Sequence, residues 1–163
     1  MRRLYLVRHA KSSWVDPGLA DFDRPLNERG LKAARFMGEF MAANDMTPEK
    51  IVSSPANRAL RTAKLISEAA NFTAPVETDE RIYEASPRTW QQVVSDLPDE
   101  TESAMVVGHN PGIEGFTHFL TGQYERMPTA AVALIEVDLK HWADISEHCC
   151  SLYKVYLPRE LMK

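Results

Sequence analysis

The stretch Leu4-Tyr5-Leu6-Val7-Arg8-His9-Ala10 joins a short apolar run directly to a cation and an imidazole. The run is continuously apolar rather than alternating, which is typical of a strand covered on both faces, as in a parallel sheet. Ligands of open α/β sheets bind at the carboxyl ends of the strands. Arg8 and His9 stand at that position, so the stretch predicts both a parallel sheet and a polar site at its edge.

Short apolar runs recur along the chain and alternate with longer helical patterns. The runs cover residues 4–7, 51–52, 104–107, 130–137 and 152–157. Apolar stripes at helical spacing predict helices over residues 28–43, 55–70, 86–97 and 111–120. The last two runs are joined without a helix, by a loop around Trp142, which predicts an antiparallel hairpin at one edge. The pattern therefore predicts a three-layer α/β/α fold with a mostly parallel central sheet.

The composition favours one folded domain spanning residues 1–163, because 163 residues with 44% hydrophobic content show no linker. The formal charge of -4 argues against a nucleic-acid or anionic-membrane surface, and any basic site must be local. The first apolar run falls short of the about 7–15 residues of a signal segment and the about 20 of a membrane helix. We therefore expect a soluble, cytoplasmic protein. Cys149 and Cys150 are expected to be unpaired thiols in a strand.

Polar residues gather in three turns that follow predicted strands. The turns are Arg8-His9-Ala10-Lys11-Ser12, Ser53-Ser54-Pro55 and Gly108-His109-Asn110-Pro111-Gly112. Ser54 and Asn110 are good N-cap residues, and each precedes a proline suited to the first helical position. Helix N-termini attract anions, and arginine binds two phosphate oxygens at once. We expect the three turns, with Arg58, to meet at one edge of the sheet and bind a phosphate.

These turns, in this order, resemble the motifs of the histidine phosphatase superfamily, which includes the cofactor-dependent phosphoglycerate mutases. The matching segments are the Arg8-His9 pair after the first strand, Ser53-Ser54-Pro55-x-x-Arg58-x-x-Arg61-Thr62-Ala63, Gly108-His109-Asn110-Pro111-Gly112 and Asp23-Arg24-Pro25-Leu26-Asn27-Glu28-Arg29-Gly30. The resemblance spans nearly the whole chain and implies a phosphoglycerate mutase-like fold. Ala10 replaces the glycine of most relatives, and Lys11 replaces an acid or amide. Ala10 and the short chain resemble a compact branch of bacterial phosphohistidine phosphatases.

The resemblance implies a role for each residue of the site. His9 is the nucleophile and becomes a phosphohistidine, Arg8 and Arg58 clamp the phosphoryl oxygens, and His109 completes the pocket. A neutral imidazole is a competent nucleophile, and neighbouring cations disfavour protonation of His9 at pH 7. Water then releases phosphate, with no metal and no cofactor. Further phosphate-binding candidates are Lys11 and Asn110.

A leaving oxygen needs a proton donor. Glu84 stands where relatives carry an acidic residue and is the candidate general acid; a solvated loop carboxylate is an equal alternative. Asp21 and Asp23 are further candidates. A phosphohistidine substrate has less need of an acid, because its leaving group protonates near neutrality. Lys11 and Arg61 are either essential groups or secondary charges near the pocket. Trp14 either packs in the core or a loop, or lines the rim of the pocket.

Three functions are compatible with this pattern. The first is a hydrolase acting on phosphohistidine of a protein, because a chain this short leaves little length for a lid over the site. The second is a phosphatase for a small sugar or nucleotide phosphate. The third is a module that binds phosphorylated partners without turnover, against which the intact His9 argues. The expected partner is a phosphorylated protein or small phosphate ester, not nucleic acid, a membrane or a metal.

Overall fold

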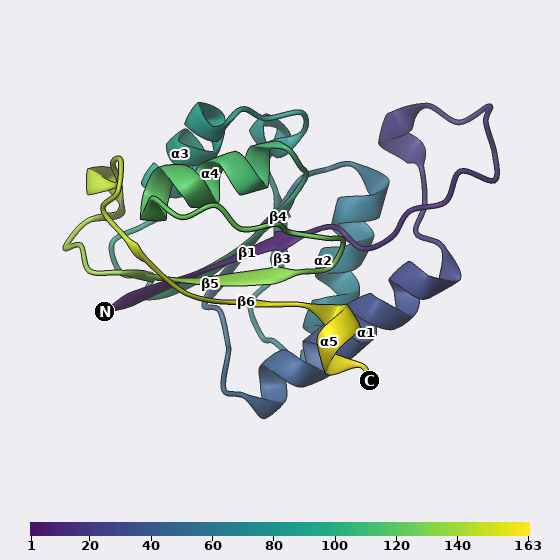
Figure 1. Ribbon diagram of the computed structural model, residues 1–163, viewed down its shortest axis with the longest axis horizontal. Helices are drawn as coiled ribbons and strands as arrows, with labels where there is room; N and C mark the ends of the chain where they lie inside the picture. The colour runs from purple at the N-terminus through teal and green to yellow at the C-terminus, as the bar shows by residue number, and fades with distance from the viewer.

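The computed structural model describes residues 1–163 and contains a six-stranded sheet between two layers of helices (Figure 1). The strands are β1 (Arg2–Arg8), β2 (Lys50–Ser53), β3 (Val76–Thr78), β4 (Ser103–Gly108), β5 (Val132–Val137) and β6 (Ser151–Tyr156). Their order is β3-β2-β4-β1-β5-β6. The strands β3, β2, β4 and β1 are parallel to one another, whereas β5 is antiparallel to both β1 and β6. The predicted three-layer fold with an antiparallel edge is therefore confirmed.

The helices divide between the two faces of the sheet (Figure 1). They are α1 (Glu28–Ala43), α2 (Asn57–Ala70), α3 (Pro87–Ser95), α4 (Gly112–Thr121) and α5 (Pro158–Leu161), with single 3-10 turns at η1 (Asp21–Asp23), η2 (Glu80–Ile82) and η3 (Trp142–Asp144). Alternate residues of β1 serve the two layers: Leu4 and Leu6 pack with Trp90 of α3, and Tyr5 packs with Met37 of α1. None of the helices combines the length and the hydrophobicity that a membrane-spanning segment requires.

Local capping accounts for the starts of α1 and α3. The Asn27 side chain accepts a hydrogen bond from the Gly30 N–H at 2.8 Å, and α1 begins at Glu28 as predicted. The Ser86 hydroxyl accepts from the Thr89 N–H, with Pro87 at the first helical position. The predicted helix over 86–97 is thus present over Pro87–Ser95.

Two helices begin later than the sequence predicts: α2 begins at Asn57 instead of residue 55, and α4 begins at Gly112 instead of residue 111. The Ser54 hydroxyl accepts from the Ala56 N–H at 3.2 Å, which closes a turn, and α2 begins only at Asn57. Asn110 stands two residues before α4, yet its side chain still accepts from the Glu114 N–H at 3.3 Å. The prediction that Ser54 and Asn110 are the N-cap positions was wrong.

Three further details differ from the prediction. The edge strand β3 was not predicted, because it is three residues long and has only one partly buried valine. The run over 130–137 forms a strand only from Val132, since Ala130 has a left-handed φ of 63°. The two cysteines lie before β6 in a turn, not in a strand, because the Cys149 N–H donates to the Ser146 carbonyl. Both thiols are free.

The sheet brings the three polar turns together. β2, β4 and β1 are adjacent and parallel, so their carboxyl ends lie along one edge. Arg8 pairs with Gly108 and Ser53 pairs with Val107, so the three strands end at nearly the same level. His9, Ser54 and His109 therefore follow their strands into one shared region.

Candidate active site

His9 follows the end of β1 and is buried, with 7% of its surface exposed. Its Nδ1 lies 2.8 Å from the Ala10 carbonyl oxygen. A carbonyl oxygen can only accept a hydrogen bond, so Nδ1 carries the proton and Nε2 keeps its lone pair. The Ala10 N–H donates to the Thr62 hydroxyl at 2.9 Å. This bond connects the turn over residues 8–12, which we call the nucleophile turn, to α2. His9 is thus held in the tautomer that makes Nε2 nucleophilic.

The pKa of His9 is lowered to about 4, mainly by burial and to a smaller extent by the nearby guanidinium groups of Arg58, Arg8 and Arg24. The hydrogen bond to the Ala10 carbonyl acts in the opposite direction. The sequence predicts that neighbouring cations keep His9 neutral, whereas in the structure burial is the larger cause. Either way, the imidazole is neutral at pH 7.

His109 faces His9, with 5.1 Å between the ring centroids and an interplanar angle of 52°. Burial lowers the pKa of His109 to about 3, and His9 and Arg58 act in the same direction. Its Nε2 lies 2.8 Å from the Ser54 hydroxyl oxygen, whereas its buried Nδ1 has no hydrogen-bond partner in the protein. His109 therefore has one ring nitrogen fixed by the protein and one open to a further partner.

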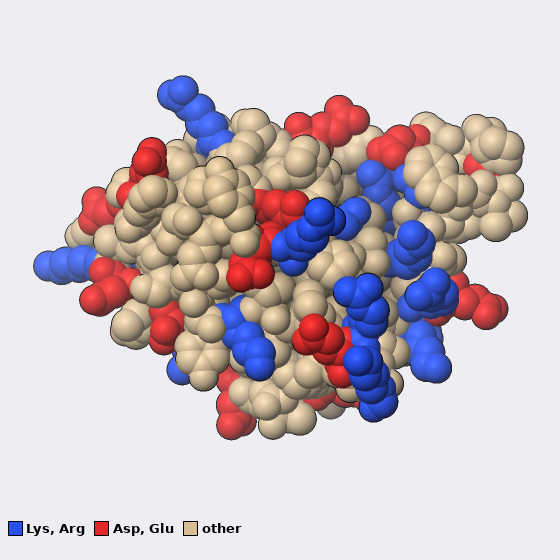
Figure 2. All heavy atoms as spheres, viewed as in Figure 1, with Lys and Arg blue, Asp and Glu red and all other residues tan.

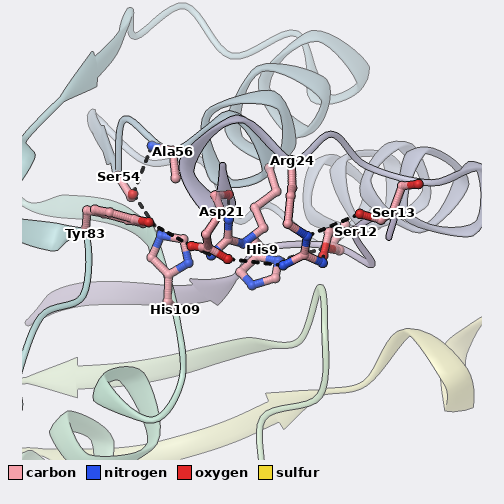
Figure 3. Close-up of polar contacts among 11 residues, drawn as sticks. His9, Ser12, Ser13, Asp21, Arg24, Ser54, Ala56, Tyr83 and His109 are labelled. Carbon is pink, nitrogen blue, oxygen red and sulfur yellow. Dashed lines mark hydrogen bonds and ion pairs between the residues drawn. The ribbon is translucent and has the colours of Figure 1, made fainter. Parts of the chain in front are cut away.

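Arg58 projects from α2 and holds Asp21 by two hydrogen bonds. One guanidinium nitrogen donates to the Asp21 carbonyl at 2.7 Å and the other to the Asp21 carboxylate at 3.0 Å. Tyr83 donates its hydroxyl proton to the same carboxylate at 2.7 Å, and Arg24 lies 3.3 Å from the other carboxylate oxygen. Figure 3 shows Asp21 between Tyr83 and Arg24, next to the rings of His9 and His109. The site thus already binds one anionic group.

The hydrogen bond from Tyr83 is the largest cause that lowers the pKa of Asp21, to about 2, and Arg58 and Arg24 add to it. The same contact raises the pKa of Tyr83 to about 12. Asp21 is therefore a carboxylate at neutral pH and has no proton to donate. This charge state weakens its candidacy as a general acid.

Arg8 and Asn110 meet at the loop that follows α4. Arg8 donates to the Met127 carbonyl at 3.1 Å, and its buried Nε has no partner in the protein. Asn110 donates to the Glu114 carboxylate at 2.7 Å and to the Met127 carbonyl at 3.3 Å. The Glu114 carboxylate also accepts from the Met127 N–H at 2.8 Å. Asn110 thus holds this loop, whereas Arg8 keeps a free donor.

Glu84 and Lys11 are exposed, and neither side chain makes a hydrogen bond or an ion pair. Glu84 directly follows Tyr83 and has a φ of 54°, in the left-handed region that residues other than glycine rarely adopt. The structure therefore brings His9, His109 and Arg58 together and leaves Glu84 and Lys11 at the surface.

Four polar residues at the site were not singled out from the sequence. They are Ser54 as a partner of His109, Thr62, Tyr83 and Arg24. Arg24 lies inside one of the segments that resemble the family, and Tyr83 is adjacent to Glu84, so both had a local signal. No three side chains of His, Cys, Asp or Glu are arranged to hold a metal ion. The site offers a neutral imidazole among cationic and neutral donors, which suits transfer of a phosphoryl group.

Known proteins similar to this chain are found by sequence and by structure. Residues 4–112 match the model of the histidine phosphatase superfamily, branch 1. The chain is 32% identical over 164 residues to an uncharacterized protein of Mycobacterium tuberculosis (strain ATCC 25618 / H37Rv), covering 94% of this chain and 100% of that protein. It is 30% identical to phosphoserine phosphatase 1 of Hydrogenobacter thermophilus, covering 87% of this chain and 67% of that protein. The structure of SixA from Agrobacterium tumefaciens, a candidate phosphohistidine phosphatase, superposes with a TM-score of 0.81 at 28% identity, covering 96% of this chain and 98% of that one.

Proposed function

Because the chain belongs to the histidine phosphatase superfamily, branch 1, we propose that it hydrolyses phosphohistidine carried on another protein, through a covalent phosphoryl group on His9. The observation that carries this proposal is the state of His9. It is a buried, neutral imidazole whose Nδ1 proton is fixed by Ala10, so its Nε2 lone pair is available to attack phosphorus.

The first chemical step forms a bond between His9 Nε2 and phosphorus and breaks the bond between phosphorus and the substrate nitrogen. The substrate imidazole leaves with the bonding electron pair, and because its other ring nitrogen is protonated near neutrality, it departs as a neutral imidazole. In the second step water attacks phosphorus, the N–P bond breaks, and its electron pair returns to Nε2. Phosphate keeps the hydroxyl of the water, and the second water proton passes to solvent.

The cations and His109 stabilise the charge on the equatorial oxygens during both steps. Arg8 has a buried Nε without a protein partner, and His109 has a buried Nδ1 in the same condition. The Arg8 Nε–H is a donor available to a phosphoryl oxygen, and His109 Nδ1 is one in the tautomer that carries its proton on that nitrogen. Arg58 donates two of its five N–H groups to Asp21, so a phosphoryl group competes with Asp21 for this face of the guanidinium.

The choice of a phosphohistidine substrate is supported by the shortage of a proton donor. Asp21 is ionised, and Glu84 is exposed with no contact to the site histidines. An alkoxide leaving group needs a proton from an acid, whereas a protonated phosphoimidazole does not. The likeness to SixA of Agrobacterium tumefaciens supports the same substrate class.

The alternative is a phosphatase for a small phosphate ester, which the 30% identity to a phosphoserine phosphatase supports. A module that binds phosphorylated partners without turnover is a third possibility, and a buried nucleophile in the reactive tautomer argues against it. We further propose a single domain and a cytoplasmic location, both of which rest on composition.

The test is release of phosphate from a phosphohistidine protein, a phosphoserine peptide, a phosphotyrosine peptide and several sugar phosphates. His9→Ala is the blank. His141→Ala is the matched control, because His141 is exposed and pairs with Asp99 near the amino end of β1. We expect rapid release from phosphohistidine only, and loss of that release in His9→Ala alone. Preference for a small ester would overturn the substrate, and no turnover of any substrate would favour the binding module.

A further inference from the structure

The loop over residues 13–23 exposes an apolar surface beside the candidate active site. Four of its side chains are apolar and exposed: Trp14 (74%), Val15 (90%), Leu19 (39%) and Phe22 (38%). Figure 1 shows this segment projecting beyond the end of the sheet, and Figure 2 shows mostly uncharged side chains there. A cluster of exposed apolar side chains on a soluble protein marks a binding surface more often than chance.

The base of the loop is held in place by a network of hydrogen bonds. Ser12 forms an antiparallel bridge with Leu26, and the Ser13 N–H donates to the Pro25 carbonyl at 2.8 Å. Arg24 donates to the Ser12 hydroxyl at 2.6 Å, and its guanidinium lies 3.2 Å from the centroid of the Trp14 ring. The cation thus supports one face of the exposed indole. Such pre-organisation lowers the entropy that a partner must remove on binding.

The loop leads directly to the nucleophile. The Phe22 ring contacts the edge of Tyr83 at a centroid distance of 5.2 Å, and Tyr83 lies 5.6 Å from His109. His109 is in turn 5.1 Å from His9. Asp21, in the same loop, occupies the guanidinium of Arg58. A partner that touches the loop therefore stands next to the phosphoryl site.

Cations without partners flank the base of the loop. The exposed basic side chains that form no ion pair include Lys11, Arg29 and Lys32, with Arg61 and Lys64 on the neighbouring helix α2. Figure 2 shows Lys and Arg side chains gathered next to the projecting loop and over α1. The whole chain carries a formal charge of -4, so this basic surface is local. It favours a partner with acidic residues close to its phosphorylated histidine.

We propose that the loop over residues 13–23, together with Lys11, Arg29 and Lys32, is the docking surface for the phosphorylated protein. The partner it fits presents apolar side chains and acidic side chains around one phosphohistidine. The apolar group contacts Trp14 and Val15, and the acidic group faces the cations at the base of the loop. This inference rests on the proposed function and adds the recognition that selects one protein substrate over another.

A membrane surface fits the loop less well than a protein does. Trp14 against the Arg24 guanidinium resembles an interfacial anchor, but the same loop carries Asp16, Asp21 and Asp23. These acidic side chains repel an anionic membrane. A folded partner with separate apolar and acidic areas can meet both parts of the surface.

Two phosphohistidine peptides test the proposal. One carries leucine and glutamate residues around the phosphohistidine, and the other carries only glycine and serine. We expect wild-type kcat/KM to favour the first peptide at least tenfold, mainly through a lower KM. Val15→Asp and Trp14→Ala should each reduce this ratio at least fivefold. Tyr153→Ala is the matched control, because Tyr153 is 62% exposed on β6, the edge strand, and should leave the ratio unchanged.

Charge reversal tests the basic part of the surface separately. Lys32→Glu should reduce the preference for the leucine and glutamate peptide, whereas Lys140→Glu, an exposed site at the opposite end of the sheet, should not. Absence of any preference in the wild type would overturn the docking surface. The proposal would also be overturned if Trp14→Ala lost binding to anionic vesicles but kept the wild-type kcat/KM ratio between the two peptides. If the enzyme hydrolysed neither of the two peptides nor free phosphoramidate, the proposed function itself would be overturned.

Discussion

Among single residues, the hydrogen-bond partners of each site histidine determine which ring nitrogen carries the proton. The Ser54 hydroxyl oxygen accepts from the Ala56 N–H, so its own proton is free to be donated to His109 Nε2. His109 would then carry its proton on Nδ1, the buried nitrogen without a protein partner. Ser54 is, on this argument, a positioning residue that makes His109 a donor toward a phosphoryl oxygen.

Replacing Ser54 tests this tautomer. Ser54→Ala should lower kcat/KM about tenfold, the effect of one lost hydrogen bond of about 1.4 kcal/mol. It should also change the ¹⁵N chemical shifts of the His109 ring toward a mixture of tautomers, which a purely structural defect would not do. Ser54→Thr should restore both kcat/KM and the ring shifts. Ser53→Ala is the control, because the Ser53 hydroxyl donates only to the Ser54 carbonyl. Unchanged ring shifts in Ser54→Ala would contradict the assignment.

Glu84 is the residue that the sequence offers as proton donor to an alkoxide leaving group, and the structure leaves it exposed. If Glu84 is the general acid, Glu84→Gln should slow hydrolysis of phosphoserine about 100-fold, since the amide cannot donate a proton. Hydrolysis of phosphoramidate should fall less than about threefold, because its leaving nitrogen protonates without help. Initial rates on the two substrates measure this difference. Equal losses, or no loss on phosphoserine, would remove Glu84 from the acid role.

At the scale of secondary-structure elements, close helix packing sets the position of the nucleophile turn. The first turn of α1 lies against the backbone of that turn, and a Cβ added at Gly30 would overlap the Lys11 carbonyl at 2.1 Å. The Asn27 N–H donates to the same carbonyl at 3.0 Å. Hence α1 and the segment that carries His9 are held together by backbone contacts. A change of side-chain rotamer cannot make room there, so the backbone itself would have to move.

Gly30→Ala should therefore disturb both stability and catalysis. We expect the free energy of unfolding to fall by about 1–3 kcal/mol, the usual range for overpacking, because backbone atoms must move apart. Phosphohistidine hydrolysis should fall as well, since the displaced turn carries the nucleophile. Urea unfolding and kcat measure the two effects. Glu39→Ala on the exposed side of α1 is the control, and a Gly30→Ala variant with wild-type stability would contradict the packing argument.

At the scale of the whole molecule, burial of two neutral histidines makes stability depend on pH. The pKa of His9 is lowered from 6.5 to about 4, and that of His109 to about 3. Between pH 6.5 and 4 the unfolded chain therefore binds protons that the folded chain does not. Above pH 6.5 both states are neutral at these sites, so these two groups add no slope.

The free energy of unfolding should consequently fall as the pH falls from 6.5 toward 4. The shift of His9 alone corresponds to about 3 kcal/mol at the end of this window. Urea midpoints measured at pH 7.0, 5.5 and 4.5 check the decline, and His9→Ala should show a smaller one. An equal decline in the variant would mean that His9 is protonated in the folded state.

From the sequence alone we predicted every helix of more than four residues, every strand except β3, the burial of β1 on both faces and the edge at which the polar turns meet. These follow from local periodicity and from the rule that parallel strands end at one edge, so Arg8, His9, Arg58 and His109 were predicted as neighbours. The exposure of Glu84 and Lys11 could not be predicted. A charged residue in a turn has the same local sequence pattern whether its side chain points into the site or into solvent.

The surroundings of His9 depend on contacts between segments that are far apart in the sequence. Asp21 meets Arg58 across 37 positions and Tyr83 across 62, and no periodic pattern links residues so far apart. Burial of His9, the partner of His109 and the exposure of Trp14 likewise depend on how separate segments pack. Periodicity reports which face of an element is apolar, whereas a pKa, a tautomer or a docking surface depends on atoms that other elements supply.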